Sequence, residues 1–172
     1  MLEPWFILRV PTASVFVYVM PKGRNLKTWS VEMVSAILNV PSIEFETDNG
    51  KPRLPQGAGH VNWSHSKGEC VLAYSKECEV GIDLEFYRER NFEAISKRFF
   101  AESEATSEAK NFYHLWTKKE AYYKCMGGSF FSTLKNDSYL NAKILHLQGP
   151  YKEKHEFALC AKIIAPCRTT RL

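Results

Sequence analysis

The chain has 172 residues, of which 45% are hydrophobic and 24% charged, and a formal net charge of +4. This length suits one large domain or two small halves, with enough apolar residues for a sizeable core. No apolar run approaches the roughly 20 residues that a membrane-spanning helix needs, so no such helix is expected. The positive charge suits a phosphorylated ligand or an acidic protein partner, although scattered surface lysines would also produce it.

The cysteines are odd in number and form no CxxC pair, which argues against a disulfide framework and against a zinc site. They are Cys70, Cys78, Cys125, Cys160 and Cys167. Reduced, mostly buried thiols in a cytoplasmic protein are the simplest interpretation. Glu3, Pro4, Arg9 and Pro11 interrupt the apolar N-terminus, so a signal peptide is not expected. We therefore predict a cytoplasmic protein.

The first elements predicted along the chain are a strand, a helix and a second strand. Residues 14–20 are β-branched and aromatic, which is typical of a strand. Ser30 could cap a helix whose apolar positions recur with helical spacing over 31–38. Residues 43–47 favour a strand that ends at Asp48-Asn49-Gly50, a strong turn signal.

A loop at 55–60 precedes three strand patterns in quick succession. These patterns occupy 60–64, 69–75 and 78–85. Lys67-Gly68 and Lys76-Glu77 are plausible tight turns between them. Such short connections favour antiparallel pairing, because a parallel crossover needs a dozen or more residues.

Helices and a last strand pair are predicted for the rest of the chain. Asn91 could cap a helix over 92–99, and Ser103 or Ser107 a helix that runs to Met126 and ends at Gly127-Gly128. Two further strands are predicted, near 138–147 and 155–164, with a turn at Gly149-Pro150. This order favours an α+β fold in which each half packs a helix against a small sheet.

Acidic residues form two clusters in the middle of the chain. Asp83 and Glu85 end an apolar strand pattern and, being two apart, project to the same face. Glu120 and Lys124 are i and i+4 on a predicted helix and also share a face. Three carboxylates and a lysine suit Mg²⁺ and the phosphate oxygens that it bridges. Taken alone, the first cluster is more simply explained as a solvated strand edge and the second as a charged helix face.

Two further segments carry groups that suit phosphate. In Asn62-Trp63-Ser64-His65-Ser66 a histidine between two serines offers several donors in a row. In Gly50-Lys51-Pro52-Arg53 two basic residues follow a turn. In isolation, the first segment is better explained by a strand histidine satisfied by a neighbour, and the second by a solvated hairpin tip.

These four segments, in this order over residues 50–128, resemble the 4′-phosphopantetheinyl transferases of the surfactin-synthetase (Sfp) type. The blocks are G-K-P, N-x-S-H-S, V-G-I-D-x-E and W-T-x-K-E-A-x-x-K. The resemblance implies two similar α+β halves that form a pseudo-dimer, here residues 1–75 and 76–172, with coenzyme A in the cleft between them. It also implies Mg²⁺-dependent transfer of the phosphopantetheine arm of coenzyme A to a serine of an apo carrier protein, releasing adenosine 3′,5′-bisphosphate.

The resemblance also implies roles for individual residues. Asp83, Glu85 and Glu120 would hold the metal, and Glu120, or a water that it holds, would be the base for the incoming serine. Lys124 would reach the attacked phosphate, with Lys119 as a second cation on or near that helix face. The implied contacts to coenzyme A come from two family blocks and from a basic segment near the N-terminus. They are Lys51, Pro52, Ser64, His65, Arg24 and Lys27.

The family's partner is an acyl or peptidyl carrier protein with an acidic helix beside the modified serine, which fits the positive charge of this chain. Three departures from the family pattern are a short segment before the G-K-P block, a short Asp83–Glu120 spacing and no residue between Gly127 and Gly128. The first of these departures keeps open a non-catalytic module that binds coenzyme A or a carrier protein. Dispersed lysines without a recognition motif argue against a nucleic-acid-binding protein. A pseudo-dimeric chain is expected to be a monomer.

Overall fold

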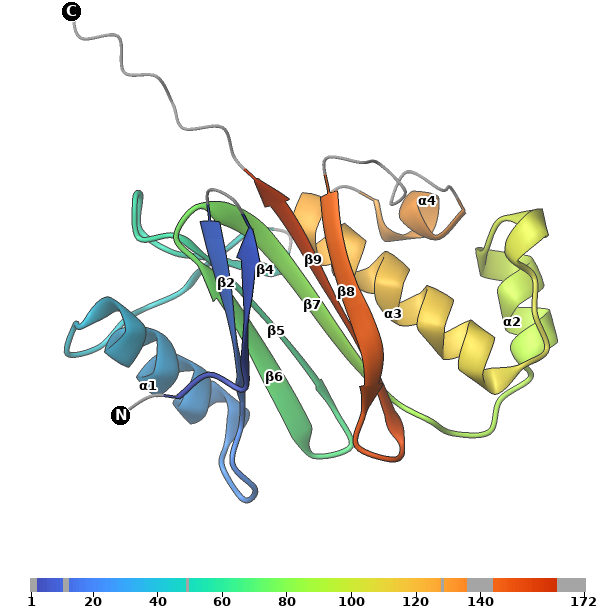
Figure 1. Ribbon diagram of the computed structural model, residues 1–172, viewed down its shortest axis with the longest axis horizontal. Helices are drawn as coiled ribbons and strands as arrows, with labels where there is room; N and C mark the ends of the chain where they lie inside the picture. The colour runs from blue at the N-terminus through green and yellow to red at the C-terminus, as the bar shows by residue number, and fades with distance from the viewer. Residues whose placement is uncertain (1–2, 11–12, 49, 128, 136–143, 164–172) are drawn as a thin grey trace, which may run out of the picture.

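The computed structural model describes residues 3–10, 13–48, 50–127, 129–135 and 144–163, and these form an α+β fold (Figure 1). Its helices are α1 (Leu26–Leu38), α2 (Phe92–Phe99), α3 (Ala109–Met126), α4 (Phe130–Lys135) and a 3-10 turn at Glu102–Glu104. Its strands are β1 (Phe6–Val10), β2 (Ala13–Val19), β3 (Glu46–Asp48), β4 (Lys51–Arg53), β5 (His60–Ser66), β6 (Glu69–Ser75), β7 (Cys78–Phe86), β8 (Ile144–Tyr151) and β9 (His155–Ile163).

Two antiparallel sheets and one hairpin organise these strands. The first sheet has the order β1-β2-β6-β5, the second has the order β7-β9-β8, and β3 pairs with β4. The predicted boundary between residues 75 and 76 thus falls where the chain leaves one sheet for the other. That the two halves are equivalent members of a pseudo-dimer stays a prediction.

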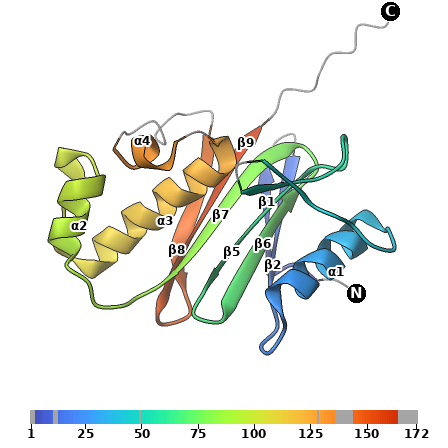
Figure 2. The same cartoon turned by 180° about the vertical axis from the view of Figure 1, so that it is seen from behind.

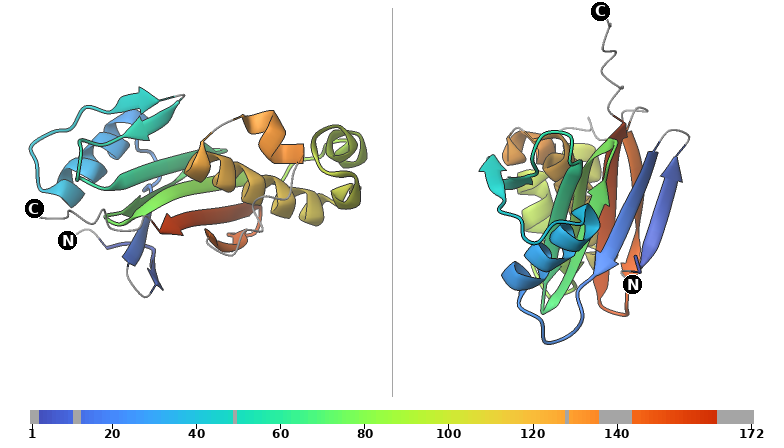
Figure 3. Two further views of the ribbon diagram at one scale, coloured as in Figure 1. Left: turned by 90° about the horizontal axis from the view of Figure 1, so that it is seen from above. Right: turned by 90° about the vertical axis from the view of Figure 1, so that its left-hand side faces the viewer.

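The two sheets share a hydrophobic core, and each has a helix on its other face. Val17 and Ala73 of the first sheet meet Ile82 and Leu159 of the second in this core. Alternate residues of the first sheet pack against α1, while α3 packs against β7 and β9. Seen from behind, both helices lie on the viewer's side of the strands (Figure 2), and the view from above shows the same arrangement (Figure 3). Alternation along each strand thus gives each sheet two buried faces.

The chain crosses between the sheets at Lys76-Glu77, where we predicted a tight turn between paired strands. Strand β6 pairs with β5 as expected, but β7 pairs with β9 and not with β6. The predicted pairing of 69–75 with 78–85 is therefore wrong. The oxygen of Ser75 accepts hydrogen bonds from the backbone of Glu77 and Cys78, so a side chain stabilises this crossover.

Two of the three predicted helices begin at a different residue from the one predicted. Asn91 caps α2 as predicted, accepting a hydrogen bond from the backbone of Ala94. The first helix begins four residues before Ser30, because Asn25 is its cap and accepts from Thr28. Helix α3 begins at Ala109 after Glu108, so neither Ser103 nor Ser107 caps it. Its predicted end at Met126 and Gly127 is confirmed.

The remaining differences concern strands. Strand β1 was not predicted. The pattern at 43–47 overlaps β3 only at its end, since β3 begins at Glu46. Strand β8 continues through Gly149-Pro150 to Tyr151, so the turn lies three residues later than predicted. Residues 136–143, 164 and Gly128 lie outside the described part of the chain.

Four cysteines lie in the described part of the chain, and all four are free and buried: Cys70, Cys78, Cys125 and Cys160. Among the described residues, no helix combines the length and apolar character required to cross a membrane.

Candidate active site

Helix α3 lies directly on strand β7, and a glycine makes this contact possible. A Cβ atom on Gly81 would lie 2.1 Å from the carbonyl oxygen of Ala121 and 2.3 Å from the backbone nitrogen of Cys125. Any side chain would therefore push the helix away from the strand. This close approach brings Glu120 on the helix near Asp83 on the strand.

Lys124 links the two carboxylates. Its Nζ lies 2.6 Å from Oδ1 of Asp83 and 3.7 Å from Oε2 of Glu120. It also donates to Oγ of Ser64 at 3.1 Å, and that hydroxyl donates to Oδ1 of Asp83 at 2.9 Å. Ser64 belongs to the first sheet and Asp83 to the second, so this network connects the two halves of the fold.

The pKa values of this cluster reflect crowded negative charge. Burial, followed by the charge of Asp83, raises the pKa of Glu120 to about 7, although Lys124 acts in the opposite direction. Burial and Asp83 also raise the pKa of Glu85. Burial would lower the pKa of Lys124, but the charges of Asp83 and Glu120 outweigh it and raise that pKa. The lysine therefore stays protonated while Glu120 titrates near neutral pH.

The donor chemistry of the three carboxylates fits a hard cation. Oδ2 of Asp83 and Oε2 of Glu85 are buried and have no hydrogen-bond partner in the described part of the protein. Buried carboxylate oxygens without a partner are costly, and Mg²⁺ prefers such ligands. However, among the described residues no three His, Cys, Asp or Glu side chains are arranged to hold a metal. In this structure the ammonium group of Lys124 supplies the positive charge instead.

Side chains of strand β5 accept hydrogen bonds from the backbone of β7, a contact that we had not predicted for this block. The side-chain oxygen of Asn62 accepts from the backbone of Ile82 at 3.0 Å, and Oγ of Ser66 accepts from the backbone of Phe86 at 3.0 Å. Asn62, Ser64 and Ser66 are two apart, so they share one face of the strand. Small polar residues at every second position, on both sides of Ser64, were the sequence signal that could have indicated this contact with β7.

Two predicted site residues lie away from the carboxylates. His65 is exposed, and it points to the opposite face of β5 from Ser64. Lys119 is fully buried; its Nζ lies 2.6 Å from Oε2 of Glu104 and donates to the carbonyl of Leu134 at 2.8 Å. One residue along a helix turns the side chain by about 100°, which explains why Lys119 and Glu120 point in different directions.

A cleft of about 350 Å³ lies beside the cluster, between β4, β5 and the end of α3. Pro52, Trp63, Tyr123 and Lys124 contribute to its walls, so both halves form it. A wider hollow of about 790 Å³ shares Pro52 and Trp63 and extends to Lys27 on α1. Two predicted coenzyme A contacts, Pro52 and Lys27, thus line connected surfaces.

The other two basic residues predicted to contact coenzyme A are engaged by carboxylates. Arg24, just before α1, forms an exposed ion pair with Glu32 on that helix. Lys51 forms a mostly buried ion pair with Glu79 on β7, with Nζ and Oε2 2.5 Å apart.

Comparison with known proteins places the chain in a family. Residues 79–162 match the model of the 4′-phosphopantetheinyl transferase superfamily. The chain is 33% identical over 133 residues to the 4′-phosphopantetheinyl transferase AcpT of Salmonella typhimurium, covering 70% of this chain and 69% of AcpT. The chain belongs to the 4′-phosphopantetheinyl transferase superfamily.

Two relatives from Bacillus support this membership. The chain is 33% identical over 130 residues to the 4′-phosphopantetheinyl transferase psf-1 of Bacillus pumilus, covering 66% of this chain and 55% of psf-1. It is 34% identical over 100 residues to Sfp of Bacillus subtilis, covering 52% of this chain and 44% of Sfp. The chain therefore spans about half the length of these two phosphopantetheinyl transferases. The resemblance predicted from the four blocks is confirmed at the level of the superfamily.

Proposed function

We propose that this protein transfers the 4′-phosphopantetheine arm of coenzyme A to a serine hydroxyl of an apo acyl or peptidyl carrier protein. The observation that carries the proposal is the cluster of Asp83, Glu85, Glu120 and Lys124 beside a cleft that both halves line. Membership of the superfamily supports the reaction class.

In this reaction the serine oxygen forms a bond to the phosphorus that carries the pantetheine arm. The bond from that phosphorus to the bridging oxygen of the pyrophosphate breaks, and adenosine 3′,5′-bisphosphate leaves. Glu120 receives the serine proton, directly or through a water. Burial and the charge of Asp83 raise its pKa to about 7, and a base works best when its pKa is close to the working pH. A cation bound by the same carboxylate would lower this pKa.

Lys124 stabilises the negative charge on the phosphoryl oxygens. Its Nζ contacts both Asp83 and Ser64, so the ammonium group is held at the boundary of the two sheets. A fixed cation next to the reacting phosphate requires little reorganisation when charge develops there.

Asp83, Glu85 and Glu120 would hold Mg²⁺. The cation would supply positive charge to the pyrophosphate. The buried, unpartnered oxygens of Asp83 and Glu85 support this assignment. Pro52 and Trp63 would contact coenzyme A in the cleft, with Lys27 near its phosphates.

The test is an intact-mass measurement on an apo acyl carrier protein incubated with this protein, coenzyme A and Mg²⁺. The expected result is a mass increase of one phosphopantetheine arm, which a chelator abolishes. Coenzyme A binding without transfer to acyl or peptidyl carriers would overturn the proposal in favour of a non-catalytic binding module.

A further inference from the structure

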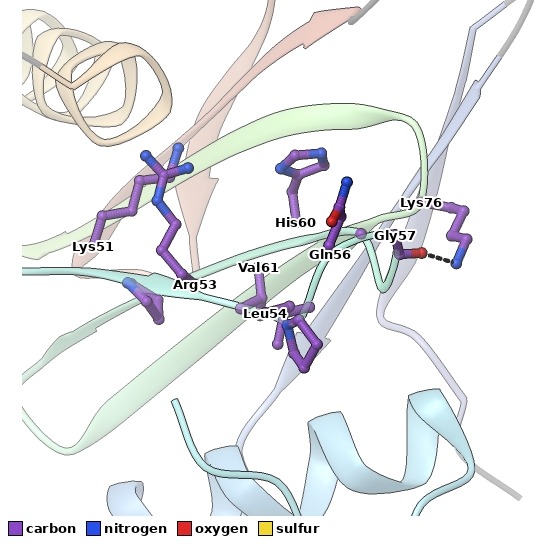
Figure 4. Close-up of a pocket in the computed structure, with 11 residues that line it drawn as sticks. Lys51, Arg53, Leu54, Gln56, Gly57, His60, Val61 and Lys76 are labelled. Atoms are coloured by element: carbon purple, nitrogen blue, oxygen red, sulfur yellow. Dashed lines mark hydrogen bonds between the residues drawn. The ribbon is translucent and has the colours of Figure 1, made fainter. Parts of the chain in front are cut away.

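Glu79, a carboxylate outside the acidic cluster, contacts three basic side chains. Oε2 of Glu79 lies 2.5 Å from Nζ of Lys51, and Oε1 lies 3.3 Å from both Nη1 of Arg53 and Nδ1 of His60. The three basic groups come from β4 and β5, and they point to the same side of these strands, toward β7 (Figure 4). Glu79 thus connects the second sheet to the segment that carries the G-K-P block.

Lys51 has a second partner, at the end of α3. Its Nζ donates to the carbonyl oxygen of Cys125 at 2.9 Å. The last carbonyls of a helix lack partners within the helix, and a cation there is favourable for the helix dipole. Lys51 therefore caps the helix that carries Glu120 and Lys124. The thiol of Cys125 also donates to the backbone carbonyl of Glu79 at 3.3 Å, which closes the connection.

The contacts of Lys51 with Glu79 and with the carbonyl of Cys125 form a bridge along one side of the cleft between the two halves. Lys51 and Pro52 line one wall of the cleft, and Lys124, the neighbour of Cys125 in the chain, lines the other. The side chains of Lys51 and Glu79 are only 12% and 22% exposed, so water screens their contact weakly. A change in the bridge would move both walls.

We propose that Glu79 is a positioning residue for coenzyme A: it holds Lys51 against the end of α3 and thereby fixes the distance between the two walls of the cleft. The inference rests on the proposed function, and it assigns Lys51 to the bridge and not to a direct contact with the ligand. Burial would raise the pKa of Glu79, but hydrogen bonds from His60 and Lys51 and the charge of Lys51 lower it to about 2. The carboxylate is therefore ionised at any working pH.

The two possible roles of Lys51 predict opposite effects of removing Glu79. If Lys51 binds coenzyme A directly, Glu79 competes with the ligand, and Glu79→Gln should tighten binding. If Lys51 forms the bridge, Glu79→Gln releases the wall of the cleft and should weaken binding. Whether Glu79→Gln tightens or weakens coenzyme A binding thus distinguishes the two roles of Lys51.

The experiment measures coenzyme A affinity by titration calorimetry with Mg²⁺ and without a carrier protein, so it requires no turnover. We expect Glu79→Gln and Lys51→Met each to weaken binding about tenfold, the effect of losing one charged hydrogen bond. The double variant should lose no more than either single variant, because both remove the same bridge. With a carrier protein, KM for coenzyme A should rise about tenfold while KM for the carrier stays within twofold.

The matched control is Glu69→Gln, which breaks an ion pair between the halves away from the cleft. Oε2 of Glu69 on β6 lies 2.6 Å from Nζ of Lys152, after β8. Glu69→Gln should leave coenzyme A affinity within twofold. Glu79→Asp keeps the charge with a shorter reach and should give an intermediate affinity, which provides a second variant if Glu79→Gln does not fold.

Three outcomes would overturn the inference. These are unchanged or tighter binding by a folded Glu79→Gln variant, an equal loss in Glu69→Gln, or additive losses in the double variant. A wild-type protein that binds coenzyme A but transfers nothing would refute the proposed function alone. A wild-type protein that does not bind coenzyme A would refute both.

Discussion

The ammonium nitrogen of Lys124 lies 2.6 Å from Oδ1 of Asp83, and this contact joins helix α3 to strand β7 at the candidate active site. Asp83 is almost fully buried, with its side chain 3% exposed. A buried carboxylate needs a cation, and Lys124 supplies one in the structure described here. The same lysine would therefore contribute to stability and, in the proposed reaction, to phosphate binding.

Replacing Glu120 should remove activity while the fold remains. We expect Glu120→Gln to lower the transfer rate by about 100- to 10,000-fold, the usual contribution of a positioned base. The rate would be measured by intact mass of the carrier, with circular dichroism to verify folding. Glu93→Gln, on the exposed pair of Glu93 with Lys97, is the control and should keep the wild-type rate. A fully active Glu120→Gln variant would contradict the assigned role.

Breaking the Lys124–Asp83 pair should destabilise the protein. Lys124→Gln leaves a buried carboxylate without its cation, so we expect the free energy of unfolding to fall by about 3 kcal/mol. Asp83→Asn combined with Lys124→Gln should recover part of this loss, because no uncompensated charge remains. Urea unfolding measures both variants. Equal losses in the single and the double variant would show that the charge is not the cause.

Helix α3 requires a glycine at position 81. Gly81→Ala would place a methyl group 2.1 Å from the carbonyl oxygen of Ala121, so the helix must shift and carry Glu120 with it. We expect a loss of about 3 kcal/mol in stability and a loss of transfer activity. Gly149→Ala is the control, since its nearest neighbour, a ring atom of Phe157, would be 4.0 Å away. A stable and active Gly81→Ala variant would contradict this packing.

Mg²⁺ should stabilise the folded protein without any substrate. At a concentration 100 times its Kd, a ligand that binds only the folded state adds about 2.7 kcal/mol, which raises Tm by roughly 5–10 °C in a chain of this size. Asp83→Asn should abolish the rise in Tm, whereas Glu69→Gln should keep it. The measurement is thermal unfolding of both variants with and without Mg²⁺. A rise in Tm of Asp83→Asn equal to that of wild type would place the cation elsewhere.

The bridge of Glu79 should be lost in acid. The pKa of Glu79 is about 2 in the folded state against 4.5 for the ordinary side chain. Because the folded-state pKa is the lower one, the stabilisation is complete above pH 4.5 and disappears as the pH falls toward 2. It amounts to at most about 3 kcal/mol. Urea unfolding between pH 6 and 3 should therefore show wild type and Glu79→Gln converging, and a constant difference would contradict this.

Sequence spacing was most informative about side-chain placement where one element alone decides the geometry. Asp83 and Glu85 share a strand, and Glu120 and Lys124 share a helix, so periodicity alone predicted which side chains point together. The failures lie where two segments meet. Nothing in the spacing of Lys119 shows that Glu104 and Leu134 would enclose its ammonium group. Likewise, the short connection at Lys76-Glu77 gave no sign that β7 would leave β6 and pair with β9.

Local patterns in the sequence were therefore sufficient for the fold class, most strands and helices, and the family. The strands and helices follow from backbone periodicity, capping and turn residues, which depend on neighbours in the chain. The family was predicted from the resemblance of four ordered blocks. The partners of charged groups depend on which elements pack together, and only the tertiary structure decides that. Lys51 is the clearest example: its sequence block predicted a ligand contact, whereas the fold places Glu79 and the end of α3 within reach of its ammonium group.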